Sequence, residues 1–401
     1  MRSAKTRFLL LLSATELAAM AVWFSASAVV PALTSAWNLG ASGQAWLTMS
    51  VQLGFVAGAL VSALLNLADR LSTRLLFSLS AFLAAACTSL IPALDPGLRL
   101  SLVLRFLTGF FLAGVYPVGM KIMATWTQKD RGLGIGLLVG ALTVGSAAPH
   151  LLKALGSAGD WKLVLGLAAG LAFLGGSIAF FFVREGPYRS PTPPFNWRYA
   201  VRMWREPGLA LANLGYFGHM WELYAMWTWV PLFLLAAFRM SGISEARSSL
   251  AAFGVVGVGG LGSLVAGPVA DRFGRTSVTI ASLATSGACC LTVGFLFTGP
   301  PLVLLAVCLV WGFAVVADSA QFSAGTSELC SAEYTGTALT IQTCLGFLLT
   351  MVTIRLLPTM VRLVTWRWAF AVLAIGPLVG IAAMVRLRRL PASVRMSCGN
   401  R

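Results

Sequence analysis

The chain has 401 residues, of which 58% are hydrophobic and only 10% are charged, and its mean hydropathy is +0.84. A soluble globular protein carries about 25% charged residues, because its surface faces water. The composition therefore excludes a soluble fold of this size and indicates that much of the surface faces lipid. The net charge of +16 would suggest a nucleic-acid partner in a soluble protein. Here no basic patch with exposed aromatics lies outside the apolar stretches, so no nucleic acid is expected.

Long apolar stretches recur along the chain and predict transmembrane helices. In hydrocarbon every backbone polar group needs an internal partner, so only helices and closed barrels can cross. A helix crosses with about 20 apolar residues, and the stretch from Val164 to Val183 fits it without the alternation of a barrel strand. We therefore predict an all-α polytopic membrane protein with twelve transmembrane helices. The predicted spans are 8–33, 44–66, 74–94, 99–124, 132–154, 162–183, 208–236, 248–270, 276–298, 301–323, 334–357 and 367–386.

Lys and Arg residues are unevenly distributed among the predicted loops. With a cytoplasmic N-terminus, most of the 29 Lys and Arg residues fall in the inner loops, which is the positive-inside pattern. We therefore expect both termini to be cytoplasmic. The compact loops favour a bacterial inner (plasma) membrane as the location.

A segment rich in proline and arginine divides the chain into two halves. Prolines such as Pro191 and Pro194 interrupt helices and stiffen a connection. We predict an N-terminal six-helix bundle over 1–186, a cytoplasmic central loop over 187–206, and a C-terminal six-helix bundle with a cytoplasmic tail over 207–401. An Asp-Arg pair follows both the second and the eighth span, which indicates a duplicated six-helix unit and two pseudo-symmetric bundles.

The loop after the eighth span carries a recognisable motif. The segment 267–275, which we call the signature loop, reads G-P-V-A-D-R-F-G-R and resembles the G-x-x-x-D-R-x-G-R loop of the major facilitator superfamily (MFS). The first-half copy is degraded, with Leu65 and Ser72 at its glycine positions. The resemblance implies two bundles around a central cavity, alternating access, and conformational gating by both loops. The residues it marks for gating are Asp69, Arg70, Arg74, Gly267, Asp271, Arg272, Gly274 and Arg275.

Two further segments resemble superfamily patterns. In the fourth span, Arg105 and Gly109 match R-x-x-x-G. The glycines of the fifth span, with Pro149, resemble the antiporter motif but lack its Gly-Pro pair. Efflux is therefore only slightly favoured as the direction, and import stays open.

Charged side chains inside spans are concentrated in the first, fourth, seventh and tenth. Each costs about 2.5–3.5 kcal/mol on insertion scales, so it persists where it faces a cavity or a partner. In the resembled fold these four helices line the central cavity. We therefore expect substrate binding or proton coupling by a set of eight residues. They are Glu16, Trp23, Arg105, Lys121, His219, Glu222, Asp318 and Gln321.

Each of these candidates also has a structural interpretation. His219 and Glu222 share a helix face, and they either change protonation near neutral pH or form a structural pair. Glu16 is either a proton or cation site or the partner of a base such as Lys121. Arg105 either attracts an anionic group or pairs between helices. Asp318 and Gln321 either line the cavity or form a buried polar pair.

The sequence thus predicts a secondary active transporter that moves a small organic solute by proton-coupled alternating access. The alternative is an uptake permease or facilitator for a small anion, which Arg105 and Lys121 favour. An integral membrane enzyme is the competing class, but only two His residues occur and no metal-spaced Cys is present. We expect no enzyme activity, no cofactor and no metal. The expected partners are the solute, protons and the lipid bilayer, with the monomer as the working unit.

Overall fold

The computed structural model describes residues 2–127, 131–156, 160–188 and 194–400, and all regular structure in these ranges is helical. The helices are α1 (Arg2–Met20), α2 (Ser25–Ala28), α3 (Val30–Trp37), α4 (Ala41–Leu64), α5 (Leu67–Arg70), α6 (Thr73–Leu94), α7 (Gly97–Leu112), α8 (Tyr116–Trp126), α9 (Arg131–Leu155), α10 (Trp161–Phe182), α11 (Trp197–Arg202), η1 (Met203–Arg205), α12 (Pro207–Met240), α13 (Glu245–Gly257), α14 (Gly259–Phe273), α15 (Arg275–Thr292), η2 (Val293–Leu296), α16 (Pro301–Ala317), α17 (Ser319–Leu329), α18 (Thr335–Ala369), η3 (Phe370–Ala374), α19 (Ile375–Arg389) and η4 (Pro391–Gly399).

Ten helical stretches within the described ranges are long and apolar enough to cross a membrane, where the sequence predicts twelve. The predicted first span, 8–33, is not among them because α1 ends at Met20 and short turns separate it from α2 and α3. The last two predicted spans form one stretch, Thr335–Arg389. Helical geometry continues through their connection except at Thr365, whose φ is 58°. The twelve-span count stays a prediction.

The chain groups into two compact units. The first contains residues 1–129, 141–190 and 228–257, and the second contains residues 130–140, 191–227 and 258–401. The division into an N-terminal and a C-terminal bundle at the 187–206 loop stays a prediction. Residues 189–193 of that loop, with Pro191 and Pro193, lie outside the described ranges.

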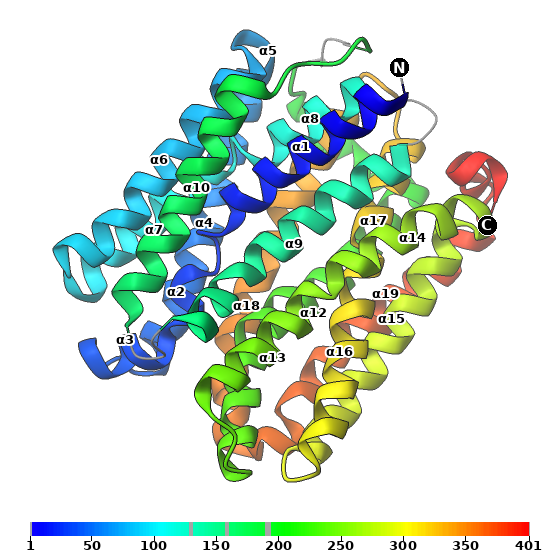
Figure 1. The fold of residues 1–401 in the computed structure, drawn as a ribbon. Helices are drawn as coiled ribbons and strands as arrows, with labels where there is room; N and C mark the ends of the chain where they lie inside the picture. Colours follow the sequence, from blue (N-terminus) through cyan, green and yellow to red (C-terminus); the bar gives the residue numbers. More distant parts are fainter. Residues whose placement is uncertain (1, 128–130, 157–159, 189–193, 401) are drawn as a thin grey trace. The chain divides into compact units, whose positions relative to one another are not determined.

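The first unit is built on close helix pairs. α10 packs against both α1 and α6, α6 against α7, and α4 against α7, as Figure 1 shows in blue to green. Glycine makes the last pair tight, since a Cβ atom on Gly109 would lie 1.8 Å from the carbonyl oxygen of Val51. Gly109 of the R-x-x-x-G pattern therefore allows two backbones to touch.

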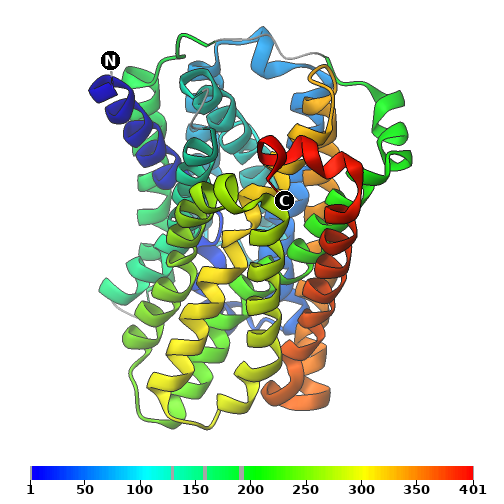
Figure 2. The same ribbon diagram turned by 90° about the vertical axis from the view of Figure 1, so that its right-hand side faces the viewer.

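The second unit is organised around α15. This helix packs against α16 and α19, and α14 packs against α16. The last helical segment, η4, turns back onto α17 and α14, and Figure 2 shows it in red. The C-terminal segment therefore lies against α14, the helix that carries most of the signature loop, and against α17.

Candidate transport site

Glu222 is a fully buried carboxylate among neutral donors in the second unit. It lies on α12, and its oxygens accept hydrogen bonds from Trp311 Nε1 at 2.5 Å, Ser286 Oγ at 2.9 Å and Cys290 Sγ at 3.2 Å. The donors come from α15 and α16. Within the described ranges no cation lies at ion-pair distance. The site can therefore hold a carboxyl group in place without fixing its charge.

His219 lies one turn before Glu222 and has a different partner. Its Nδ1 atom is 2.9 Å from Oδ1 of Asp318, at ion-pair distance, and both side chains are buried. The other ring nitrogen, Nε2, has no hydrogen-bond partner among the described residues. Asp318 lies at the junction of α16 and α17. The structure therefore joins His219 to Asp318, while Glu222 is held separately.

Gln321 connects this region to the signature loop. Its Oε1 atom accepts a hydrogen bond from Nη1 of Arg275 at 2.8 Å. Arg275 also donates from Nε to Glu328 Oε2 at 2.7 Å and from Nη2 to Glu328 Oε1 at 2.6 Å. A bidentate arrangement of this kind is specific to the planar guanidinium group. Gln321 thus lies in a network of buried and half-buried polar groups.

The signature loop itself is shaped by its glycines and by Asp271. Gly274 has φ 93° and lies between α14 and α15, a backbone conformation that favours glycine. A Cβ atom on Gly267 would lie 2.9 Å from the carbonyl oxygen of Gly132 in α9. Asp271 Oδ1 lies 3.3 Å from Arg275 Nη2. Arg272 is exposed and rests over the ring of Phe273.

The C-terminal segment is attached to the same loop. The backbone N–H of Ser397 donates to Glu328 Oε2 at 3.1 Å, and its hydroxyl donates to the carbonyl oxygen of Ala270 at 3.2 Å. Asn400 Nδ2 donates to the carbonyl oxygen of Asp271 at 2.8 Å. Two of these hydrogen bonds hold the C-terminal segment against the signature loop, and the third holds it to Glu328 of α17.

Glu16 is the buried carboxylate of the first unit. It lies on α1 with no exposure, and neither carboxylate oxygen has a hydrogen-bond partner among the described residues. The side chain of Tyr116 lies within electrostatic reach of it. The predicted alternative, a salt bridge to Lys121, is not formed, because Lys121 Nζ lies 2.5 Å from Asp69 Oδ1 and donates to the carbonyl oxygen of Ala68.

Arg105 stabilises the break that ends α1. From α7 its guanidinium donates to the carbonyl oxygens of Val22 at 2.7 Å, Trp23, and Leu47 at 3.4 Å, and to Ser25 Oγ at 3.3 Å. These carbonyls lie where the helix is interrupted or in α4, so the buried cation replaces missing backbone donors. The guanidinium thus connects α7 to α4 and to the backbone of the break after α1. Trp23 is buried beside the break.

The three predicted gating residues of the first half lie in α5 and at the start of α6 and have different surroundings. Asp69 is the partner of Lys121. Arg70 is exposed, and Arg74 rests over the ring of Phe180 with its Cζ atom 5.8 Å from the ring centroid. The structure therefore does not bring these three side chains into one cluster comparable to that around Arg275.

Several partners were missed by the sequence reasoning. Glu328 lies seven residues after Gln321, so helical spacing would have placed both on one face, but the predicted span ended at residue 323. Cys290 is one of the free buried cysteines, and no sequence pattern marks it as a donor to Glu222. No group of three or more metal-ligating side chains occurs in the described part of the chain.

Comparison with known proteins identifies the family. The model of the Major Facilitator Superfamily matches residues 11–260 and 212–397, which together span nearly the whole chain. The chain therefore belongs to the Major Facilitator Superfamily. It is an integral membrane protein of a transporter family, not an enzyme.

Two curated relatives carry transporter names. The protein named "Putative niacin/nicotinamide transporter NiaP" from Bacillus subtilis is 27% identical over 223 residues, covering 53% of this chain and 55% of that protein. The "Uncharacterized transporter ESBP6" of Saccharomyces cerevisiae is 22% identical over 255 residues, covering 58% of this chain and 35% of that protein. The chain thus matches about half of the first relative's length and about a third of the second's.

Proposed function

We propose that this protein moves a small organic solute across a bacterial inner membrane by proton-coupled alternating access. In this proposal twelve spans form two pseudo-symmetric six-helix bundles, both termini are cytoplasmic, and the monomer is the working unit. Efflux is slightly favoured as the direction.

The environment of Glu222 carries the proposal. A buried ionised carboxylate is costly unless a cation or strong donors compensate for lost water. Trp311, Ser286 and Cys290 supply neutral donors only, so the carboxyl group is not committed to one charge by a fixed cation. An ionisable residue at membrane depth with this environment is a candidate proton site. Glu16 is the corresponding candidate of the first unit.

The other predicted residues receive supporting roles. The His219–Asp318 contact, one turn from Glu222, would respond electrostatically when Glu222 gains or loses a proton. Gln321 and Arg275 would relay that change to the signature loop, whose contacts hold one conformation and release in another. Arg105 and Trp23 would maintain the break after α1.

Reconstitution tests the coupling. Wild-type protein and Glu222→Gln are placed in proteoliposomes, and the flux of a candidate solute is measured with and without an imposed proton gradient. We expect the gradient to accelerate wild-type flux and to leave the variant unaffected. Glu333→Gln, which changes an exposed carboxylate, is the control and should behave as wild type. A Glu222→Gln protein that still concentrates solute against the gradient rules out Glu222 as the proton site.

A pyridine-type solute is the second, more specific candidate. The observation that favours it is the 27% identity with the relative named for niacin and nicotinamide. Competition by either compound for solute flux would support it, and no effect from both at millimolar concentration would exclude it. The small-anion alternative stays open, with Lys121 paired to Asp69 and Arg105 donating to backbone carbonyls.

A further inference from the structure

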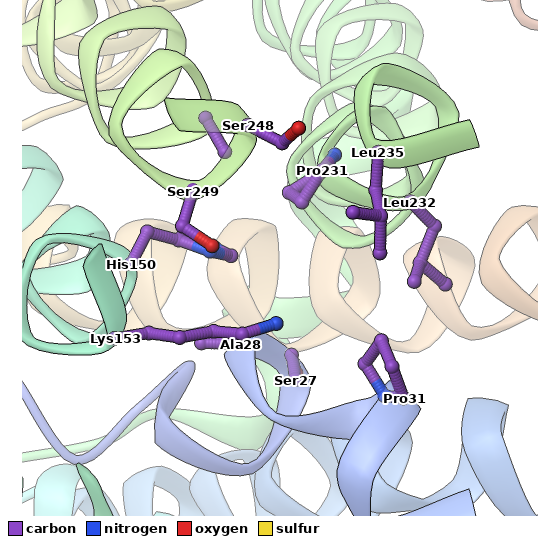
Figure 3. Close-up of a pocket in the computed structure, with 11 residues that line it drawn as sticks. Ser27, Ala28, Pro31, His150, Lys153, Pro231, Leu232, Leu235, Ser248 and Ser249 are labelled. Atoms are coloured by element: carbon purple, nitrogen blue, oxygen red, sulfur yellow. The ribbon is translucent and has the colours of Figure 1, made fainter. Parts of the chain in front are cut away.

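The cavity beside Lys153 in the first unit is too small for an organic ligand. Residues of α2, α3, α9, α12 and α13 line it, as Figure 3 shows, and it has room for about one water molecule. Ligand pockets usually measure about 300–1,000 Å³. Lys153 is also paired with Glu245, at 2.8 Å. This cavity therefore supports no ligand site, whereas the surface of α11 in the second unit has the features of one.

One face of α11 is fixed to the second unit. The backbone N–H of Asn196 donates to Thr337 Oγ1 at 3.0 Å, and the Asn196 side chain accepts from the N–H of Tyr199 at 3.1 Å, which caps the helix. The ring of Tyr199 stacks on that of Tyr334 with centroids 4.2 Å apart. Its hydroxyl lies 3.1 Å from Cys330 Sγ. These contacts set the orientation of α11, so its other face points outward.

The outward face of α11 and η1 is apolar. Trp197, Val201 and Trp204 are 60%, 67% and 36% exposed, while Ala200 and Met203 between them are buried. Spacings of four and three residues place the exposed three on one side of a helix, and we call them the α11 ridge. An apolar ridge on a short amphipathic segment is the feature that inserts between lipid headgroups.

Arginines alternate with the ridge along the chain. Arg198, Arg202 and Arg205 are all exposed. Even with the carboxylates of Glu206 and of Glu333 counted, this surface is net positive. Clusters of basic residues beside a membrane attract anionic lipids, and the guanidinium fork matches phosphate oxygens. The sequence analysis expected no basic patch with exposed aromatics here, because exposure becomes visible only in the folded chain.

The α11 ridge lies at the end of a span. Glu206 is the one residue between η1 and α12, and α12 is long and apolar enough to cross a membrane. Tryptophan is enriched where spans meet the membrane–water boundary. A surface at this level faces lipid headgroups, which makes the bilayer its natural occupant.

We propose that the α11 ridge and its three arginines bind anionic phospholipid of the phosphatidylglycerol type. The tryptophan rings enter the headgroup layer, and the guanidinium groups hold lipid phosphates. By the predicted topology this is the cytoplasmic leaflet. The proposal goes beyond the transport argued from Glu222, because lipid binding here requires neither a solute nor a proton gradient.

Hydrogen exchange of the full-length protein in nanodiscs tests the proposal. One set of nanodiscs contains phosphatidylcholine alone, and the other contains phosphatidylcholine mixed with phosphatidylglycerol. We expect the amides of 197–205 to exchange at least about threefold more slowly in the mixed lipid, because lipid contact suppresses local opening. Raised salt should remove the difference, since exposed charges are screened.

Variants separate the charged part from the apolar part. Arg198→Gln with Arg202→Gln should abolish the difference between the two lipids. Arg355→Gln with Arg362→Gln removes the same charge from exposed positions on the predicted outer side, and it should keep the difference. Trp197→Ser should speed the exchange of 197–205 in both lipids, because the ridge is then shorter.

Three outcomes overturn the proposal. They are equal exchange of 197–205 in the two lipids, a difference that survives in the double variant of Arg198 and Arg202, and equal protection by soluble glycerol phosphate in phosphatidylcholine nanodiscs. The last would show a site for free phosphate rather than for lipid. If the double variant does not fold, the salt dependence of the wild type decides, and a difference that persists at high salt rejects the proposal.

Discussion

Arg275 Nη1 donates to Gln321 Oε1 at 2.8 Å, and this contact joins the signature loop to α17 three residues after Asp318. The same guanidinium holds Glu328 with two further hydrogen bonds, and Glu328 accepts from the N–H of Ser397. A continuous set of contacts therefore runs from the buried centre of the second unit to the C-terminal segment.

Arg275→Lys should loosen this network. Lysine keeps the charge but cannot reach Gln321 and both oxygens of Glu328 together. Hydrogen bonds that involve charged groups contribute about 1.5–3 kcal/mol each, so a loss of at least about 1.5 kcal/mol is expected. Hydrogen exchange of the η4 amides should accelerate about tenfold. Arg272→Lys is the control, since Arg272 is exposed; equal protection of η4 in both variants would contradict the network.

His219 and Asp318 should be energetically coupled. Removing one partner of a buried hydrogen-bonded pair leaves the other polar group without its partner, at a cost of about 1–3 kcal/mol. His219→Gln and Asp318→Asn should therefore each lower the unfolding midpoint, while the double variant should lose less than the sum. A double-mutant cycle should return a coupling of about 1–3 kcal/mol. Strict additivity would show that the 2.9 Å contact contributes nothing.

Gly109→Ala should separate α4 from α7. Its new methyl group would lie 1.8 Å from a carbonyl oxygen of Val51, and a clash with backbone cannot be relieved by rotating a side chain. Thermal unfolding in detergent should show a loss of about 1–3 kcal/mol. Gly166→Ala is matched to it, because a Cβ atom at that α10 position meets nothing within 4 Å. There the gain in helix propensity, up to about 1 kcal/mol, should leave stability unchanged or improved.

Much of the helical framework could be predicted from hydropathy, because a backbone in lipid must satisfy its polar groups internally and an apolar stretch therefore becomes helical. The break after Met20 could not, since the stretch around Trp23 is as apolar as a continuous span and its carbonyls are satisfied by Arg105, which is far away in sequence. The sequence also did not predict which side chains pair, because the partners lie far apart along the chain. Periodicity shows which residues share a face, but it does not show that Lys121 chooses Asp69 rather than Glu16.

Acid should weaken the contact of Asp95 in the connection between α6 and α7. Hydrogen bonds from Lys162 and from the Trp37 indole lower the pKa of this carboxyl below its ordinary value. The folded-state pKa of Asp95 is lower than its unfolded pKa of about 3.9. The contribution of ionised Asp95 to the stability of the fold is therefore complete above the unfolded pKa, and it disappears as the pH falls through the folded-state pKa. The group is exposed, so the effect should be small and reduced by salt.

Asp95→Asn isolates this contribution. Asp95 has φ 45°, and asparagine tolerates that conformation as well as aspartate does. The unfolding midpoint of the wild type should fall more steeply than that of the variant below about pH 4, and the difference should shrink at about 1 M salt. If the unfolding midpoints of the wild type and of Asp95→Asn fall equally with pH at low salt, the protonation of Asp95 is not coupled to folding.

Arg105→Lys distinguishes a structural cation from a substrate-binding one. A lysine ammonium cannot span the carbonyls of Val22, Trp23 and Leu47, so at least one buried acceptor would lose its partner, at a cost of about 1–3 kcal/mol. We expect a lower unfolding midpoint with an unchanged solute KM in the folded fraction. Arg99→Lys, exposed on the same helix, should change neither. If Arg105 instead bound an anionic group of the solute, KM would rise in Arg105→Lys while the midpoint stayed at the wild-type value, because the break after α1 would then not depend on the guanidinium.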